Sequence, residues 1–157
     1  MNGPLFDCYV LAPSRTAQVA IGFLDHFIPN RVARFDLSDP SEVLGLPGDA
    51  SITDAVAFLE ANPRVAYSMY WSRAGDDSPL LATLAFTADA ELILGLSYCS
   101  DNDPHCASQT LEEMILAVGA THGYATVEEA PALTRTEFLR KAKDPSEAAG
   151  PPSRSGD

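Results

Sequence analysis

The sequence predicts an α+β domain, in which helices pack on one face of a mixed, largely antiparallel sheet. Two observations lead to this fold class. Apolar residues alternate along some segments and recur every three or four residues along others, which gives the order β-α-β-α-β-β-β-α-β. In addition, the three strand-like segments in the middle are joined by short connections. A parallel crossover needs about a dozen residues, so those neighbours must be antiparallel.

Strands and helices alternate in the first half of the chain. Residues 6–12 are rich in aromatic and β-branched side chains and are followed by Pro13, which predicts the first strand. Apolar residues recur at helical spacing from Ala17 to Ile28, and Pro29 ends that helix. The elements expected next are a strand at 31–37, a loop at 39–49 and a helix that opens with a capping box from Ser51 to Asp54 and closes at 62–63.

A three-stranded meander is predicted in the second half, at residues 65–71, 80–87 and 92–97. Within its first strand, alternation places Trp71 on one face, expected in the core, and Tyr70 on the other. The elements expected after the meander are a polar loop at 98–107, a helix that begins with a capping box at 110–113 and ends at 122–123, a strand at 124–127 and a brief helix around Phe138 and Leu139.

Length and composition indicate one domain, residues 1–143, and a disordered C-terminal tail, residues 144–157. The chain has 157 residues, of which 46% are hydrophobic, so it can bury a core. The tail consists mainly of Pro, Ser, Gly, Ala and charged residues. The chain has no apolar run of about 18 residues and no signal-peptide pattern at its first residues, so we expect no membrane span and a cytoplasmic location.

The net charge of the chain indicates which kinds of molecule it can bind. The chain has 22 acidic and 10 basic residues, which gives a net charge of −12. Nucleic-acid backbones and anionic membranes are bound by positively charged surfaces, so neither is an expected partner. A basic protein would be attracted to this chain and would associate with it rapidly.

A search for catalytic and metal-binding motifs is negative. The sequence has no Gly-x-Ser-x-Gly, no phosphate-binding Gly-rich loop and no His-Glu-x-x-His. Cys99, His105 and Cys106 lack the second ligand pair that zinc sites usually have, and residues 101–103 begin like a calcium loop without its Gly and distal Glu. We therefore expect no catalytic residue, no metal site and no cofactor. The odd number of cysteines argues against disulfides, and Cys8 is expected in the core.

Acidic residues in the loops that follow strands, together with one tyrosine, are the candidate partner-binding residues. Turns that project from a rigid sheet are common binding positions, and an exposed tyrosine is a frequent interface hot spot. Solubility alone also explains each acidic patch, and that alternative stays open. The candidate residues are Tyr70, Asp76, Asp77, Asp101 and Asp103.

Four segments are similar to parts of small bacterial proteins, some of which resemble immunity proteins of polymorphic toxin systems. The resemblance covers residues 6 to about 139 and includes no active-site motif, so no functional residue is carried over. It implies a non-enzymatic protein of the bacterial cytoplasm that neutralises a cognate toxin by binding it. The segments are Phe6-Asp-Cys-Tyr-Val-Leu-Ala-Pro-Ser-Arg15, Phe23-Leu-Asp-His-Phe-Ile-Pro-Asn-Arg31, Tyr67-Ser-Met-Tyr-Trp71 and Ile93-Leu-Gly-Leu-Ser97.

Two other functions remain open at this point. One is a small enzyme with a dispersed site near Tyr70, Asp101 and His105. The other is a generic interaction module within a larger assembly. A toxic protein encoded by the adjacent gene would favour the immunity function over both.

Overall fold

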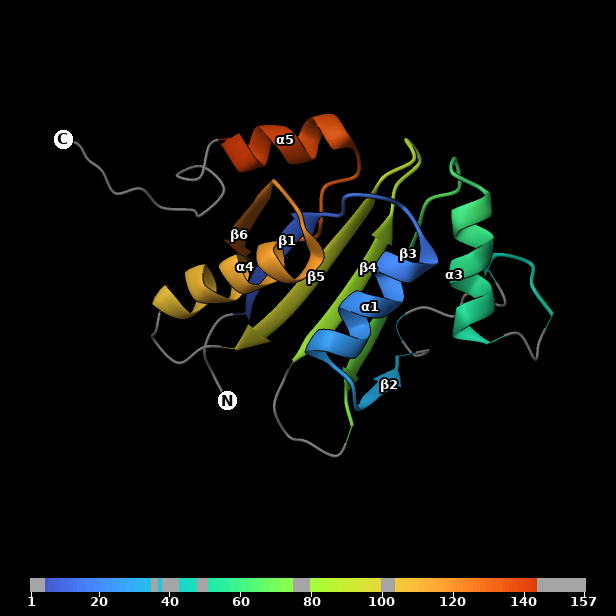
Figure 1. Cartoon of the computed structure of the whole chain (residues 1–157), viewed down its shortest axis with the longest axis horizontal. Helices are drawn as coiled ribbons and strands as arrows, with labels where there is room; N and C mark the ends of the chain where they lie inside the picture. Colours follow the sequence, from blue (N-terminus) through green and yellow to red (C-terminus); the bar gives the residue numbers. More distant parts are fainter. Residues whose placement is uncertain are drawn as a thin grey trace.

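An antiparallel sheet organises the computed structural model, which describes residues 5–34, 37, 43–47, 51–74, 80–99 and 104–143. Within these residues six strands pair in the order β2-β3-β4-β5-β1-β6 (Figure 1). The elements are β1 (Leu5–Leu11), α1 (Ala17–Phe27), β2 (Arg31–Ala33), α3 (Ile52–Ala61), β3 (Tyr67–Arg73), β4 (Leu81–Phe86), β5 (Leu92–Cys99), α4 (Pro104–Val118), β6 (Gly123–Val127) and α5 (Arg135–Lys143).

The predicted α+β class and order of elements are confirmed, and so is the meander, which is formed by β3, β4 and β5. The sheet differs from the prediction in one respect, because every described pairing is antiparallel rather than mixed. The reason lies in the path of α1. This helix crosses the sheet, so β2 pairs with β3 at the far edge and not with β1, where a parallel neighbour would have formed (Figure 1).

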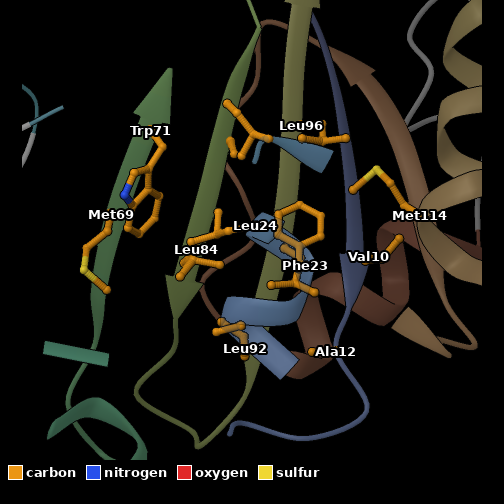
Figure 2. Packing of buried hydrophobic residues seen from close by; sticks show 14 of the residues in the cluster. Val10, Ala12, Phe23, Leu24, Met69, Trp71, Leu84, Leu92, Leu96 and Met114 are labelled. Atoms are coloured by element: carbon orange, nitrogen blue, oxygen red, sulfur yellow. The ribbon is translucent and has the colours of Figure 1, made fainter. Parts of the chain in front are cut away.

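The main hydrophobic core lies between the sheet and the helices α1, α3 and α4. Phe23 and Leu24 of α1 pack beside Leu84 and Leu92 of the sheet, and Met114 of α4 packs near the end of the same core (Figure 2). Two predictions about this core are confirmed. Trp71 is only 3% exposed, and Cys8 is fully buried, with burial raising the pKa of its thiol to about 12. We call this side of the sheet the helical face.

The final helix, α5, packs on the opposite face, so the prediction that the helices share one face holds for α1, α3 and α4 only. Phe138 of α5 is fully buried in a second apolar cluster with Leu11, Ile93 and Tyr124. The physical reason is the alternation of side chains along the strands. It leaves an apolar strip on the second face near β6, and α5 covers that strip. The rest of this second face, here called the open face, includes the candidate residue Tyr70.

Local signals placed several element ends correctly, but the strand predicted at 31–37 ends at Ala33, and α4 differs from its prediction at both ends. Its end expected at 122–123 is at Val118, where Gly119 follows with a left-handed φ of 73°. Ser51 Oγ accepts a hydrogen bond from Asp54 N at 3.1 Å and Ser51 N donates to Asp54 Oδ2 at 2.9 Å, so the capping box that opens α3 is confirmed. By contrast, α4 already begins at Pro104, so the helix start expected at 110–113 lies within it. Proline is favoured in the first turn of a helix because its missing N–H would be unpaired there in any case. Among the described helices, none has the length and apolar character needed to cross a membrane.

Candidate functional site

Of the five predicted partner-binding residues, the structure describes Tyr70, which lies half-buried on the open face of β3. Asp76, Asp77, Asp101 and Asp103 lie outside the described residues, as does the predicted tail, 144–157. The strands that precede the four aspartates are described. Because β3 and β5 both run antiparallel to β4, they end at the same end of the sheet.

Tyr70 borders a groove on the open face with a volume of about 430 Å³. The groove lies towards the end of the sheet where β3 and β5 finish, and the segment that follows β6 forms one side of it. We call it the open-face groove. Its lining residues are Leu5, Asp7, Tyr9, Tyr70, Leu81, Thr83, Ser97, Glu128, Glu129, Ala130 and Pro131.

Strand register explains why the open-face groove exists. One row of paired residues crosses the sheet from Tyr70 through Thr83 and Gly95 to Tyr9. Tyr70 and Tyr9 stand three strands apart, roughly 14 Å at the usual strand spacing. The Tyr9 ring lies over Gly95, so the hollow between the two tyrosines lies above the small residue Thr83. An added Cβ at Gly95 would lie 2.7 Å from Cε1 of Tyr9, so the glycine is needed for the Tyr9 ring to lie over β5.

A buried carboxylate lies in the neighbouring row of the sheet. Asp7 is 6% exposed and pairs across the strands with Ser97 on one side and Thr126 on the other. Its Oδ1 accepts a hydrogen bond from Ser97 Oγ at 2.5 Å, and its Oδ2 accepts one from Glu129 N at 2.9 Å. Burial raises the pKa of Asp7, which the two hydrogen bonds oppose and the nearby carboxylates of Glu128 and Glu129 reinforce.

Glu129 is fixed at the side of the groove by contacts to both its backbone and its side chain. Tyr9 Oη donates to its carbonyl oxygen at 2.6 Å, while its carboxylate accepts hydrogen bonds from Thr126 Oγ1 and Lys141 Nζ. The bond from Lys141, followed by that from Thr126, holds the pKa of Glu129 below its ordinary value. The preceding residue, Glu128, has a φ of 49°, in the left-handed region that few non-glycine residues adopt. The groove side is therefore rigidly built and carries negative charge.

Local sequence patterns do not predict most of this groove. Asp7 and Ser97 are 90 positions apart, and only the β1–β5 register brings them together. One signal was available, because Asp7 is a lone carboxylate within an otherwise apolar strand pattern. A charged residue at such a position needs buried partners, and their presence is informative. Tyr9 and Thr83 carry no local signal of a site, whereas a glycine within a strand, as at Gly95, indicates a bulge or the close approach of another group, here the Tyr9 ring.

The alternative site near Tyr70, Asp101 and His105 is not assembled by the described part of the fold. Position 105 lies in the first turn of α4, and α4 packs on the helical face, against β1 and β6. Tyr70 lies on the open face, so the sheet separates the two positions. Within the described residues, no group of three His, Cys, Asp or Glu side chains is arranged to hold a metal ion.

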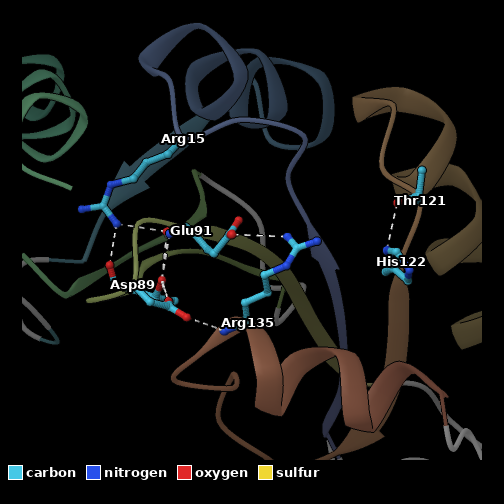
Figure 3. A network of polar contacts seen from close by, with 7 residues as sticks. Arg15, Asp89, Glu91, Thr121, His122 and Arg135 are labelled. Atoms are coloured by element: carbon cyan, nitrogen blue, oxygen red, sulfur yellow. Dashed lines mark hydrogen bonds and ion pairs between the residues drawn. The ribbon is translucent and has the colours of Figure 1, made fainter. Parts of the chain in front are cut away.

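A second polar cluster, around Arg15, is structural. Its guanidinium group lies 5.1 Å from the centre of the Phe86 ring and joins the end of α3 and the α3–β3 connection to the β4–β5 turn. Figure 3 shows the side of this cluster near the β4–β5 turn. Five hydrogen bonds use the five N–H groups that an arginine side chain has, so no donor remains for a ligand. The acceptors are the backbone carbonyl oxygens of Leu59, Asn62, Val65, Thr87 and Glu91, at 2.6–3.1 Å.

The turn between β4 and β5 links the Arg15 cluster to α5. Asp89 Oδ2 accepts a hydrogen bond from Arg135 N at 2.9 Å, at the first residue of α5, and Glu91 forms an ion pair with the Arg135 side chain (Figure 3). An acidic group at a helix N-terminus is stabilised by the exposed amides and the helix dipole. These contacts hold the turn and α5 together, and they leave the open-face groove as the candidate functional site.

No protein-family model, curated protein or solved structure matches the chain.

Proposed function

We propose that this chain is an immunity-type protein of the bacterial cytoplasm, which neutralises a cognate toxin by binding it on the open face. The observation that carries the proposal is the open-face groove, which combines Tyr70 with the carboxylates of Asp7, Glu128 and Glu129. The helical face is covered by α1, α3 and α4, whereas the groove is open to a partner. Its acidic lining, in a chain of net charge −12, favours a basic protein.

The predicted acidic residues also favour binding of the partner at the open face. Asp76 and Asp77 follow β3 in the sequence, and Asp101 and Asp103 follow β5. Both of these strands end at the end of the sheet where the groove lies. Charges at the rim of an interface mainly set the association rate, whereas an aromatic anchor mainly sets the dissociation rate. We assign the first role to the four aspartates and the second to Tyr70.

The experiment is co-expression in a bacterial host with the protein encoded by the adjacent gene, followed by binding kinetics with the purified pair. We expect the chain to restore growth. Tyr70→Ala should speed dissociation by the equivalent of about 1–3 kcal/mol, and changing the four aspartates to Asn should slow association several-fold and flatten its salt dependence.

A matched control comes from the helical side of the molecule. Leu116 on α4 is 83% exposed, so Leu116→Ala also truncates a large side chain but should change neither rate. The proposal fails if the adjacent product is harmless or does not bind. It also fails if binding depends on Leu116 and is insensitive to Tyr70 and the aspartates. An interaction without protection from toxicity would instead indicate a generic interaction module.

A further inference from the structure

We propose that the open-face groove is a subsite for one arginine side chain on the surface of the partner. This rests on the proposed function only in taking a polypeptide as the occupant. The groove is lined by apolar side chains, among them Leu5, Leu81 and Pro131, as well as by the carboxylates of Asp7, Glu128 and Glu129. A long side chain with an aliphatic stem and a cationic head has the matching distribution of polarity.

The acidic side of the groove favours a cation over a neutral group. Asp7, Glu128 and Glu129 line the same groove, and the charges of Glu128 and Glu129 both raise the pKa of Asp7. Glu129 already forms an ion pair with Lys141, so a bound cation would be attracted mainly by Asp7 and Glu128. Asp7 is already held in place by Ser97 Oγ and Glu129 N, so its carboxylate loses little freedom on binding. Each of its oxygens has a second lone pair that can accept a further hydrogen bond.

The aromatic residues favour arginine over lysine. Half-buried Tyr70 borders the hollow above Thr83 on one side, and the Tyr9 ring, which lies over Gly95 and is only 3% exposed, borders it on the other. A guanidinium group is planar, stacks on aromatic rings and donates to a carboxylate through two parallel N–H groups. An ammonium group is more strongly hydrated and cannot do both at once in the same way. The combination of the Tyr70 ring and a fixed carboxylate therefore selects the planar cation.

Gly95 gives this inference a steric test. A methyl group at this position would lie 2.7 Å from Cε1 and 2.8 Å from Cδ1 of Tyr9, so the ring must move. The ring lies above the sheet beside the hollow, and its displacement changes the shape of the groove. Gly95→Ala should therefore weaken arginine binding without removing any charge or any hydrogen-bonding group.

The experiment is an NMR titration of the full chain with three amino acids whose α-amino and α-carboxyl groups are blocked and therefore uncharged. They are N-acetylarginine amide, N-acetyllysine amide and N-acetylnorleucine amide. We expect saturable shifts of the Thr83, Gly95 and Ser97 amides with the arginine probe, with several-fold weaker binding of lysine and no binding of norleucine. Tyr70→Ala and the isosteric Glu128→Gln should each weaken arginine binding several-fold. Leu116→Ala, on α4, is the control and should leave it unchanged.

The inference is overturned if lysine binds as well as arginine, if norleucine gives the same shifts, or if arginine binding ignores Tyr70 and Glu128. The Gly95→Ala variant tests the inference when its amide spectrum outside the groove is native, which shows that it is folded. In such a variant, loss of arginine binding supports the proposed geometry and unchanged arginine binding contradicts it. The two proposals can fail separately. A neutralised toxin without an arginine response removes the subsite alone, and an arginine response without a toxin partner removes the immunity function alone.

Discussion

We expect replacement of Arg15 to lower the free energy of unfolding more than replacement of other residues that are equally exposed. It is half-buried and donates five hydrogen bonds to backbone carbonyl oxygens in the α3–β3 connection and the β4–β5 turn. Among the described contacts, no other side chain joins these two segments through as many hydrogen bonds. Arg15→Ala removes these five hydrogen bonds at once, although the carbonyl oxygens of Leu59, Asn62 and Glu91 each keep a backbone N–H donor.

The size of the effect follows from the number of bonds and their partial burial. A hydrogen bond from a charged donor contributes about 1.5–3 kcal/mol in a dry site. Here the freed carbonyls can partly bind water, so about 1 kcal/mol for each bond is the better value, with loss of the contact to Phe86 included. We therefore expect Arg15→Ala to lower the free energy of unfolding by about 3–5 kcal/mol. Arg15→Lys has three donors and should cost roughly half as much.

The measurement is urea unfolding, followed by the fluorescence of Trp71. This is the chain's single tryptophan, and it is 3% exposed in the folded state. The matched control is Arg135→Ala. The Arg135 side chain is 51% exposed and also contacts the β4–β5 turn through Glu91, but as a surface ion pair that contributes less than about 1 kcal/mol. If Arg15→Ala is no more destabilising than Arg135→Ala, the carbonyl cluster is not what holds these segments together.

Two further predictions concern the open face. The raised pKa of Asp7 means that its protonated form favours folding, so its contribution is present below the ordinary value of 3.8 and is lost as the pH rises through the folded-state pKa. In urea unfolding from about pH 3 to about pH 7, Asp7→Asn should become more stable relative to the native chain as the pH rises, and a constant difference would contradict this. Phe138 is fully buried, so Phe138→Ala should lower the free energy of unfolding by about 3–5 kcal/mol and speed amide exchange throughout α5. Leu139→Ala, at a half-buried position, is the control. If Phe138→Ala destabilises the chain no more than Leu139→Ala does, α5 is held mainly by its polar contacts.

The sequence predicts those parts of the fold that depend on short-range patterns. The Ser51–Asp54 capping box and the opposite faces of Tyr70 and Trp71 are fixed by residues within one helical turn or one strand. The start of α4 was misplaced because two helix-start signals compete in this region. The polar pattern at 110–113 resembles a cap, but Pro104 begins the helix, and packing of Ala107 and Met114 into the core is compatible only with the longer helix.

Short-range sequence patterns do not predict the groove, because it depends on the register between strands that are distant in the sequence. Tyr70 was found as a candidate from its own strand, yet its neighbours across the sheet, Thr83, Gly95 and Tyr9, come from three other strands. No local pattern states which strands will be adjacent. Hydrophobic alternation predicts which face a residue occupies, but adjacency and register arise from the packing of the whole sheet.

Three departures from the rules of stable structure meet at the groove. Asp7 is a buried carboxylate in a strand, Gly95 weakens the middle of another strand, and Glu128 has a left-handed backbone at a φ of 49°. Each costs stability, and a chain selected for stability alone would replace them. Departures of this kind concentrate at functional sites, where the special geometry has a use. Asp7 and Glu128 line the groove, and Gly95 lies under the Tyr9 ring that borders it, which is a physical reason to look for the partner on the open face.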